Sequence, residues 1–122
     1  MYEVKIVDQS KKIIGLKWVG PLEPEHVEQA NKELEKLITS LRSSTFDLVV
    51  DMRESGVLKT ETQKKLEEHQ RWLLTKGMNR AAVVFKSAVV KLQLSRTARN
   101  SDHKNEFHFD NYDDALNFLL KA

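Results

Sequence analysis

Polar side chains follow two unbroken apolar runs of the sequence, where two buried strands are expected to end. After the first run comes a segment rich in charged and hydroxyl groups, with a glycine that permits a turn: Asp51, Arg53, Glu54, Ser55, Gly56 and Lys59. After the second run come Lys86 and Ser87. Ligands of open α/β sheets collect outside the carboxyl ends of the strands. The sequence therefore predicts a ligand- or partner-binding site with both signs of charge at this edge.

Ser55 is the one residue of this segment that could serve as a hydrolase nucleophile. The nucleophile elbow Gly-x-Ser-x-Gly would need glycine at the two positions held by Arg53 and Val57. A catalytic serine also needs a nearby base, and nothing in the sequence brings a histidine to Ser55; the candidates are His26, His69, His103 and His108. A serine hydrolase is therefore the least favoured hypothesis, and no catalytic residue is expected.

Composition argues against metal and cofactor chemistry. The chain has no cysteine, no two histidines at the spacing of a helical metal site, and four scattered glycines in place of a phosphate-binding loop. Its 20 Lys and Arg against 18 Asp and Glu leave a net charge of +2, with the two signs interleaved, which does not favour nucleic-acid binding. The absence of cysteine suits a cytoplasmic protein.

Hydrophobic periodicity predicts a single α/β domain over residues 1–122. Alternating residues indicate two opening strands, while the apolar runs indicate buried strands that need cover on both faces. The predicted order is β-β-α-β-α-β-α-β-α, with an antiparallel N-terminal hairpin, a parallel remainder and four main helices. In residues, the strands are expected at 2–7, 13–19, 46–52, 81–85 and 107–109, and the helices at 24–41, 60–76, 87–98 and 112–120.

The helix expected at 87–98 combines apolar and basic residues. Val89 and Leu92 have helical spacing and are expected to face the core, with Val90 as a further candidate. The basic patch consists of Lys91, Arg96 and Arg99, and Asp102 reduces its charge. Such a patch either binds an acidic partner or is simply a solvated helix face.

Trp18 lies on one face of the second opening strand. A tryptophan there belongs either to the core or to a ligand pocket or protein interface. If all helices covered one side of the sheet, the other side would need a homodimer partner or an apolar ligand.

The order and length of these elements resemble the SpoIIAA-like fold of STAS domains and of small STAS/SEC14 bacterial proteins, over essentially the whole chain. The resemblance depends on four local features: the strand ending at Asp51, the loop Glu54-Ser55-Gly56, the strand closed by Lys86-Ser87, and the ending Tyr112–Leu116.

The resemblance to anti-sigma-factor-antagonist STAS domains makes Ser55 a candidate phosphosite. Those domains carry a kinase-modified serine between the third strand and the second helix. They usually read Asp-Ser-Ser-Gly at that point, whereas Arg53 and Glu54 precede Ser55 here. The alternative is that Ser55-Gly56 simply makes a turn, for which both residues are suited.

The resemblance implies a non-enzymatic binding or signalling module that contacts a protein partner through the loop after the third strand. The SEC14-like relatives imply an alternative, a carrier of a small apolar or lipid-like ligand. Both hypotheses require neither a metal nor a cofactor.

Overall fold

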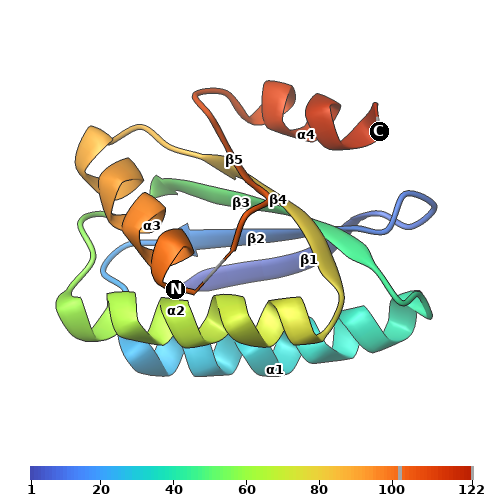
Figure 1. Ribbon diagram of the computed structural model, residues 1–122, viewed down its shortest axis with the longest axis horizontal. Helices are drawn as coiled ribbons and strands as arrows, with labels where there is room; N and C mark the ends of the chain where they lie inside the picture. The colour runs from blue at the N-terminus through green and yellow to red at the C-terminus, as the bar shows by residue number, and fades with distance from the viewer. Residues whose placement is uncertain (102, 122) are drawn as a thin grey trace.

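The computed structural model describes residues 1–101 and 103–121, and within them it shows five strands and four helices in the predicted order (Figure 1). The elements are β1 (Tyr2–Asp8), β2 (Ile13–Val19), α1 (Pro24–Leu41), β3 (Phe46–Glu54), α2 (Thr60–Thr75), β4 (Met78–Val84), α3 (Ala88–Asn100), β5 (Glu106–Phe109) and α4 (Tyr112–Leu120).

The strands lie in the sheet in the same order as in the sequence, β1-β2-β3-β4-β5. β1 and β2 are antiparallel, and all later pairs are parallel, which confirms the predicted mixed sheet. Parallel crossovers are right-handed in nearly all proteins. A sheet that grows in one direction therefore places α1, α2 and α3 on the same face, while α4 lies on the other face (Figure 1).

The buried strand β3 separates two hydrophobic cores. Leu48 and Val50 face the larger core under α1, α2 and α3, whereas Val49 faces the smaller core under α4. Both faces of the central strands are thus covered by the chain's own helices. Val7 and Ile13, at the hairpin end of β1 and β2, still join the smaller core. Farther along these two strands, the charged side chains of Glu3, Lys5 and Lys17 line the second face instead.

A buried ion pair holds α4 on the sheet. Nη2 of Arg80 lies 2.6 Å from Oδ2 of Asp47 on the neighbouring strand. The same nitrogen donates to the carbonyl oxygen of Leu119 at 3.2 Å, and the guanidinium lies 5.4 Å from the ring centroid of Phe118. Arg80 therefore joins two strands and the last helix.

Helix α3 presents a different face to the core from the one predicted. Val89 and Leu92 are exposed, at 51% and 68%, while Val90 and Leu94 are buried. The prediction was confirmed for Val90 and wrong for Val89 and Leu92, because the stripe through Val89 and Leu92 continues into arginines, which are costly to bury. The stripe that the structure buries continues into small residues, Thr97 and Ala98.

The strand β4 also differs from its predicted extent. It begins at Met78, three residues before the apolar run at Ala81, because Met78 pairs with Phe46 of β3 and its side chain enters the larger core. Its end at Val84 lies within one residue of the prediction.

Gly77 connects α2 to β4 in a conformation that other residues rarely adopt. Its φ is 102°, and a Cβ atom there would collide with the backbone carbonyl of Ser44. We expect Gly77→Ala to lower the free energy of unfolding by more than about 3 kcal/mol, because backbone strain and collision add. Urea unfolding measures this.

Gly20 provides the matched control for that substitution. Its φ is 73°, but no atom would lie within 4 Å of a Cβ added at this position. Gly20→Ala should therefore cost only the left-handed backbone penalty of about 1–2 kcal/mol. Equal losses in the two variants would show that the contact with Ser44 has no role.

His69 is a titratable group in the larger core. It is packed between Trp18 and Trp72, and Nδ1 lies within hydrogen-bond distance of the side-chain oxygen of Asn31. Burial lowers the pKa of His69 from 6.5 to about 4. The folded protein therefore keeps this imidazole neutral under conditions in which the unfolded chain binds a proton.

We expect the free energy of unfolding to fall as the pH drops from 6.5 towards 4, and His69 to account for about 3 kcal/mol of that fall. The stability is present above 6.5, because neither state then binds the proton. Urea unfolding at several pH values measures the slope. His69→Gln, which keeps a donor for Asn31, should show a shallower decline; an unchanged slope would contradict the assignment.

Candidate functional site

Asp51 and Arg53 form a bidentate ion pair where β3 ends. Nε and Nη2 of Arg53 donate to the two carboxylate oxygens of Asp51 at 2.9 and 2.8 Å. Burial raises the pKa of Asp51, but the hydrogen bonds and charge of Arg53 outweigh it, so the pKa lies below its ordinary value. The guanidinium lies 5.8 Å from the ring centroid of Tyr112. The pair therefore fixes the end of β3 against the start of α4.

A hollow of about 220 Å³ lies beside this pair, on the part of the sheet that α4 leaves uncovered. Its wall holds Lys5 and Lys17 as well as Asp51 and Arg53, and Lys17 pairs with Glu54 at 2.8 Å. Because the opposite charges pair with each other, the hollow has no concentrated charge of one sign with which to attract an ion.

The loop after β3 turns away from this hollow towards α2 and α3. The side chain of Ser55 is 0% exposed, and its hydroxyl lies 3.1 Å from the carbonyl oxygen of Met52 and 3.2 Å from that of Gly56. Gly56 has a φ of 69°, and Lys59 pairs with Glu23 at the start of α1. The loop is therefore a tight turn with its serine directed inward.

Gln93 of α3 ties this loop to the helix. Its side-chain oxygen accepts a hydrogen bond from the backbone N–H of Leu58 at 2.9 Å, and its side-chain nitrogen donates to the Leu58 carbonyl at 3.0 Å. One amide side chain thus pairs with both backbone groups of Leu58, as a strand neighbour would. The loop and α3 form one continuous surface.

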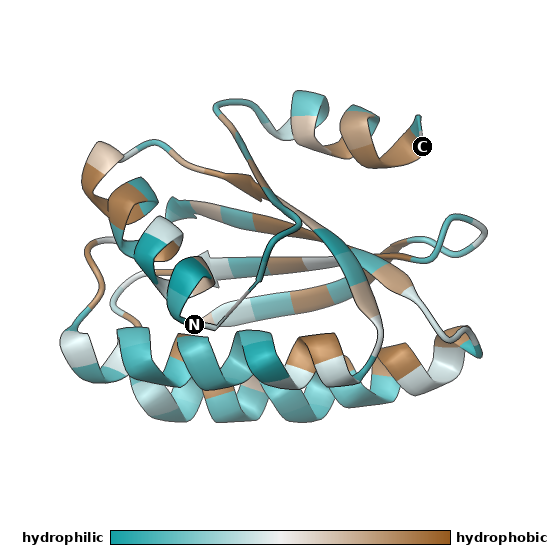
Figure 2. Ribbon diagram, in the orientation of Figure 1, coloured by the Kyte–Doolittle hydropathy of each residue, from teal (hydrophilic) through white to brown (hydrophobic). Residues whose placement is uncertain are grey.

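We call this surface the docking surface: the loop from Ser55 to Lys59 and the outward face of α3. Three of its apolar residues are largely exposed: Val57 at 65%, together with Val89 and Leu92. Figure 2 shows the apolar loop and the apolar start of α3 at the same end of the molecule. Four basic residues accompany them: Lys86, Lys91, Arg96 and Arg99.

The helix α3 itself carries no acidic residue from Ala88 to Asn100. Leu92 and Arg96 are four residues apart and share a face, as do Arg96 and Arg99. The outward face is therefore apolar at its start and basic at its end. Asp102, expected to reduce this charge, lies outside the described residues.

Ser87 has a structural role at the start of α3. Its hydroxyl oxygen accepts a hydrogen bond from the backbone N–H of Val90 at 3.3 Å, which is the geometry of a helix N-cap. Lys86 precedes it on the surface. Ser87 therefore defines where α3 begins, and Lys86 contributes charge to the docking surface.

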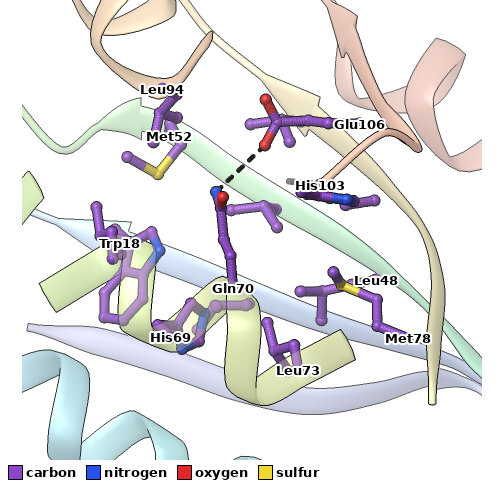
Figure 3. Close-up of a pocket in the computed structure, with 15 residues that line it drawn as sticks. Trp18, Leu48, Met52, His69, Gln70, Leu73, Met78, Leu94, His103 and Glu106 are labelled. Carbon is purple, nitrogen blue, oxygen red and sulfur yellow. Dashed lines mark hydrogen bonds between the residues drawn. The ribbon is translucent and has the colours of Figure 1, made fainter. Parts of the chain in front are cut away.

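A small cavity lies between the sheet and the helices α2 and α3, with a volume of about 40 Å³ (Figure 3). Apolar side chains form most of its wall, including Trp18, Leu48, Met52, Leu73, Met78 and Leu94. Trp18 is buried and contributes to this wall, so it belongs to both the core and the cavity.

Apart from His69, which packs against Trp18, the polar residues that line the cavity are Gln70, His103 and Glu106. Nε2 of Gln70 donates to Glu106 at 3.4 Å, and the hydroxyl of Ser101 donates to the Gln70 oxygen at 2.6 Å. The second carboxylate oxygen of Glu106 pairs with His108 at 2.8 Å. His103 also lines the cavity, yet neither of its ring nitrogens has a hydrogen-bond partner in the part of the chain that the structure describes.

In the described ranges, 1–101 and 103–121, the structure shows no group of three or more His, Cys, Asp or Glu side chains that could hold a metal ion. Within the same ranges, none of the helices has the length and apolar character needed to cross a membrane.

The structure divides the predicted site residues among three places, of which the cavity holds Trp18. Asp51, Arg53 and Glu54 lie on the α4 side, while the loop from Ser55 to Lys59 lies with Lys86 and α3. Sequence reasoning missed Gln93, whose role depends on a contact between distant segments. His103 was considered in the sequence only as a metal ligand or a catalytic base. No local sequence pattern signals that this histidine is buried.

The similarity of this chain to known proteins lies in its structure. No family model and no curated protein matches the sequence. An uncharacterised DUF3478 protein from Shewanella loihica PV-4, described as having a SpoIIAA-like fold, is similar at a TM-score of 0.73 with 19% identity, covering 97% of this chain and 93% of that one.

Two structures of SpoIIAA are also similar at 11% identity. The unphosphorylated anti-sigma factor antagonist has a TM-score of 0.68, covering 100% of this chain and 98% of that one. The phosphorylated Bacillus protein, a cell fate determinant, has a TM-score of 0.63, covering 98% and 99%. The predicted resemblance is confirmed at the level of architecture: this chain has the SpoIIAA-like fold.

Proposed function

We propose that this protein is a non-enzymatic binding module that contacts a protein partner through the docking surface. The observation that carries the proposal is the exposure of three apolar side chains, Val57, Val89 and Leu92, on segments joined by Gln93. Single exposed apolar residues are ordinary, whereas a group beside basic residues is typical of an interaction site.

The chemistry of the Ser55 loop fits binding better than catalysis. The Ser55 hydroxyl is buried and its hydrogen-bond partners in the described ranges are backbone carbonyls. Asp51 and Arg53 pair with each other on the opposite side of the sheet. Asp51, Arg53 and the Ser55 hydroxyl therefore stabilise the fold through these contacts.

The structural comparisons support the same proposal. SpoIIAA, which shares this fold, is an anti-sigma factor antagonist and has been solved in a phosphorylated form. By analogy, we propose that Ser55 is a phosphosite that regulates the docking surface. Because Ser55 is buried, a kinase would reach it only after the loop opens, and a phosphate there would hold the loop away from Gln93.

Cross-linking tests the docking surface. A photoreactive amino acid in place of Leu92 is expected to form a defined adduct in extracts of the protein's own host, because Leu92 is at the centre of the exposed face. The same amino acid in place of Gln29, exposed on α1, should form no such adduct. Gel electrophoresis and mass spectrometry identify the product.

Charge reversal provides the matched comparison for that experiment. Arg96→Glu with Arg99→Glu should reduce the Leu92 adduct at least tenfold, whereas Lys32→Glu with Lys36→Glu on α1 should leave it unchanged. An adduct that forms equally from Leu92 and Gln29 would refute the proposal. An adduct with a second copy of this chain would assign the surface to a homodimer.

A second candidate function is the carriage of a small apolar or lipid-like ligand. The cavity under α2 and α3 favours it, because it is lined by apolar side chains and contains the buried imidazole of His103, which has no partner in the described ranges. Its volume of about 40 Å³ is close to that of one water molecule. A lipid-sized ligand would therefore require α2 or α3 to move away from the sheet.

Mass spectrometry of the protein purified from its own host tests both the carrier and the phosphosite. A native spectrum with an additional mass that disappears on denaturation is expected of a carrier. If Ser55 is the phosphosite, a phosphate should persist on denaturation and map to Ser55. Ser87, the other serine among the predicted site residues, should carry no phosphate. A phosphate on other residues only would contradict the role of Ser55, and a bare native mass would contradict the carrier.

A further inference from the structure

His103 is the one side chain of the described ranges whose buried polar atoms have no hydrogen-bond partner. The residue is only 6% exposed. A buried polar group without a partner destabilises the fold, so native proteins rarely retain one without a compensating contact. The ring lines the cavity, and an occupant of the cavity would supply the missing contact.

Glu106 lies at the same end of the cavity as His103 (Figure 3). Its side chain is 6% exposed and already bonds to Gln70 and His108. A carboxylate has about four lone-pair sites, so it can accept a further hydrogen bond from an occupant. Burial lowers the pKa of His103, with the charge of Glu106 acting in the opposite direction, so the imidazole favours its neutral form.

His103 and Glu106 favour one chemical class of ligand over others. An anion would be repelled by Glu106, and a charged amine would lose its hydration against the apolar wall. A neutral hydroxyl group fits both residues, because it can accept from the N–H of a neutral imidazole and donate to a carboxylate. The remainder of the wall is mostly apolar, and its other polar groups already have partners (Figure 3).

We propose that the cavity binds a small neutral molecule with an apolar body and one hydroxyl group, the hydroxyl lying between His103 and Glu106. This inference rests on the second candidate function, ligand carriage, and names the chemistry of its ligand. The apolar body lies against Leu48, Leu73 and Met78.

Met52 and Met78, the two methionines of the wall, allow the cavity to expand around a ligand larger than a water molecule. Met52 and Met78 have unbranched side chains that change rotamer at little cost. A cavity of about 150 Å³ is known to hold benzene, so the present volume of about 40 Å³ must expand for an aromatic ring. The methyl groups of these two residues therefore report directly on occupancy.

Phenol and benzene form a matched pair of probes that differ by one hydroxyl. With 13C-methyl methionine in the full chain, we expect phenol to shift the signals of Met52 and Met78 but not that of exposed Met1. Phenol should bind about fivefold more tightly than benzene, as one additional hydrogen bond would give. Phenol alone should also shift the ring 15N signals of His103.

His103→Phe is the matched variant, since it keeps the ring and removes both nitrogens. It should bind benzene as before and lose the preference for phenol. Equal binding of the two probes by the unchanged protein, with no shift of the His103 signals, would overturn the hydroxyl preference and leave ligand carriage intact. If neither probe shifts Met52 or Met78, both the inference and the carrier function are wrong.

Discussion

The direction in which the sheet grows decides where the helices and both candidate sites can lie. From β2 to β5 each strand is added on the same side of the previous one. Right-handed crossovers then place α1, α2 and α3 on one face. Only α4, after the last strand, is free to cover the other, and Arg80 holds it there through Asp47 and Leu119. The larger core, with its cavity, follows from this asymmetry.

The helix α3 takes part in both candidate sites with opposite faces. Leu94 points inward and lines the cavity, and the segment after the helix brings His103 to its wall. Leu92 points outward beside the loop that Gln93 holds. A partner on the outer face and a ligand in the cavity would therefore contact the same helix. Binding of the ligand would change the affinity for the partner only if α3 has two conformations and the two binding events favour them to different degrees.

The sequence predicts what depends on local pattern and misses what depends on tertiary contact. The apolar runs of β3 and β4 are predictable from the sequence, because hydrophobic periodicity is a local pattern. Asp51 and Arg53, which the sequence predicts as binding residues, pair with each other in the structure. The contact between Gln93 and Leu58 joins residues 35 positions apart. Likewise, no local pattern distinguishes buried His103 from a histidine on a surface loop.

The orientation of α3 follows from a comparison of two costs. Exposing Val89 and Leu92 forfeits about 1.5–3 kcal/mol of burial energy for each side chain. Turning the helix to bury them would carry Arg96 and Arg99 towards the core, where removing each charge from water costs several kcal/mol without a partner. The arginines therefore set the orientation, and the apolar exposure is its consequence. Stability alone would favour polar residues at these two exposed positions, so their apolar character, beside exposed Val57, supports the proposed contact with a partner.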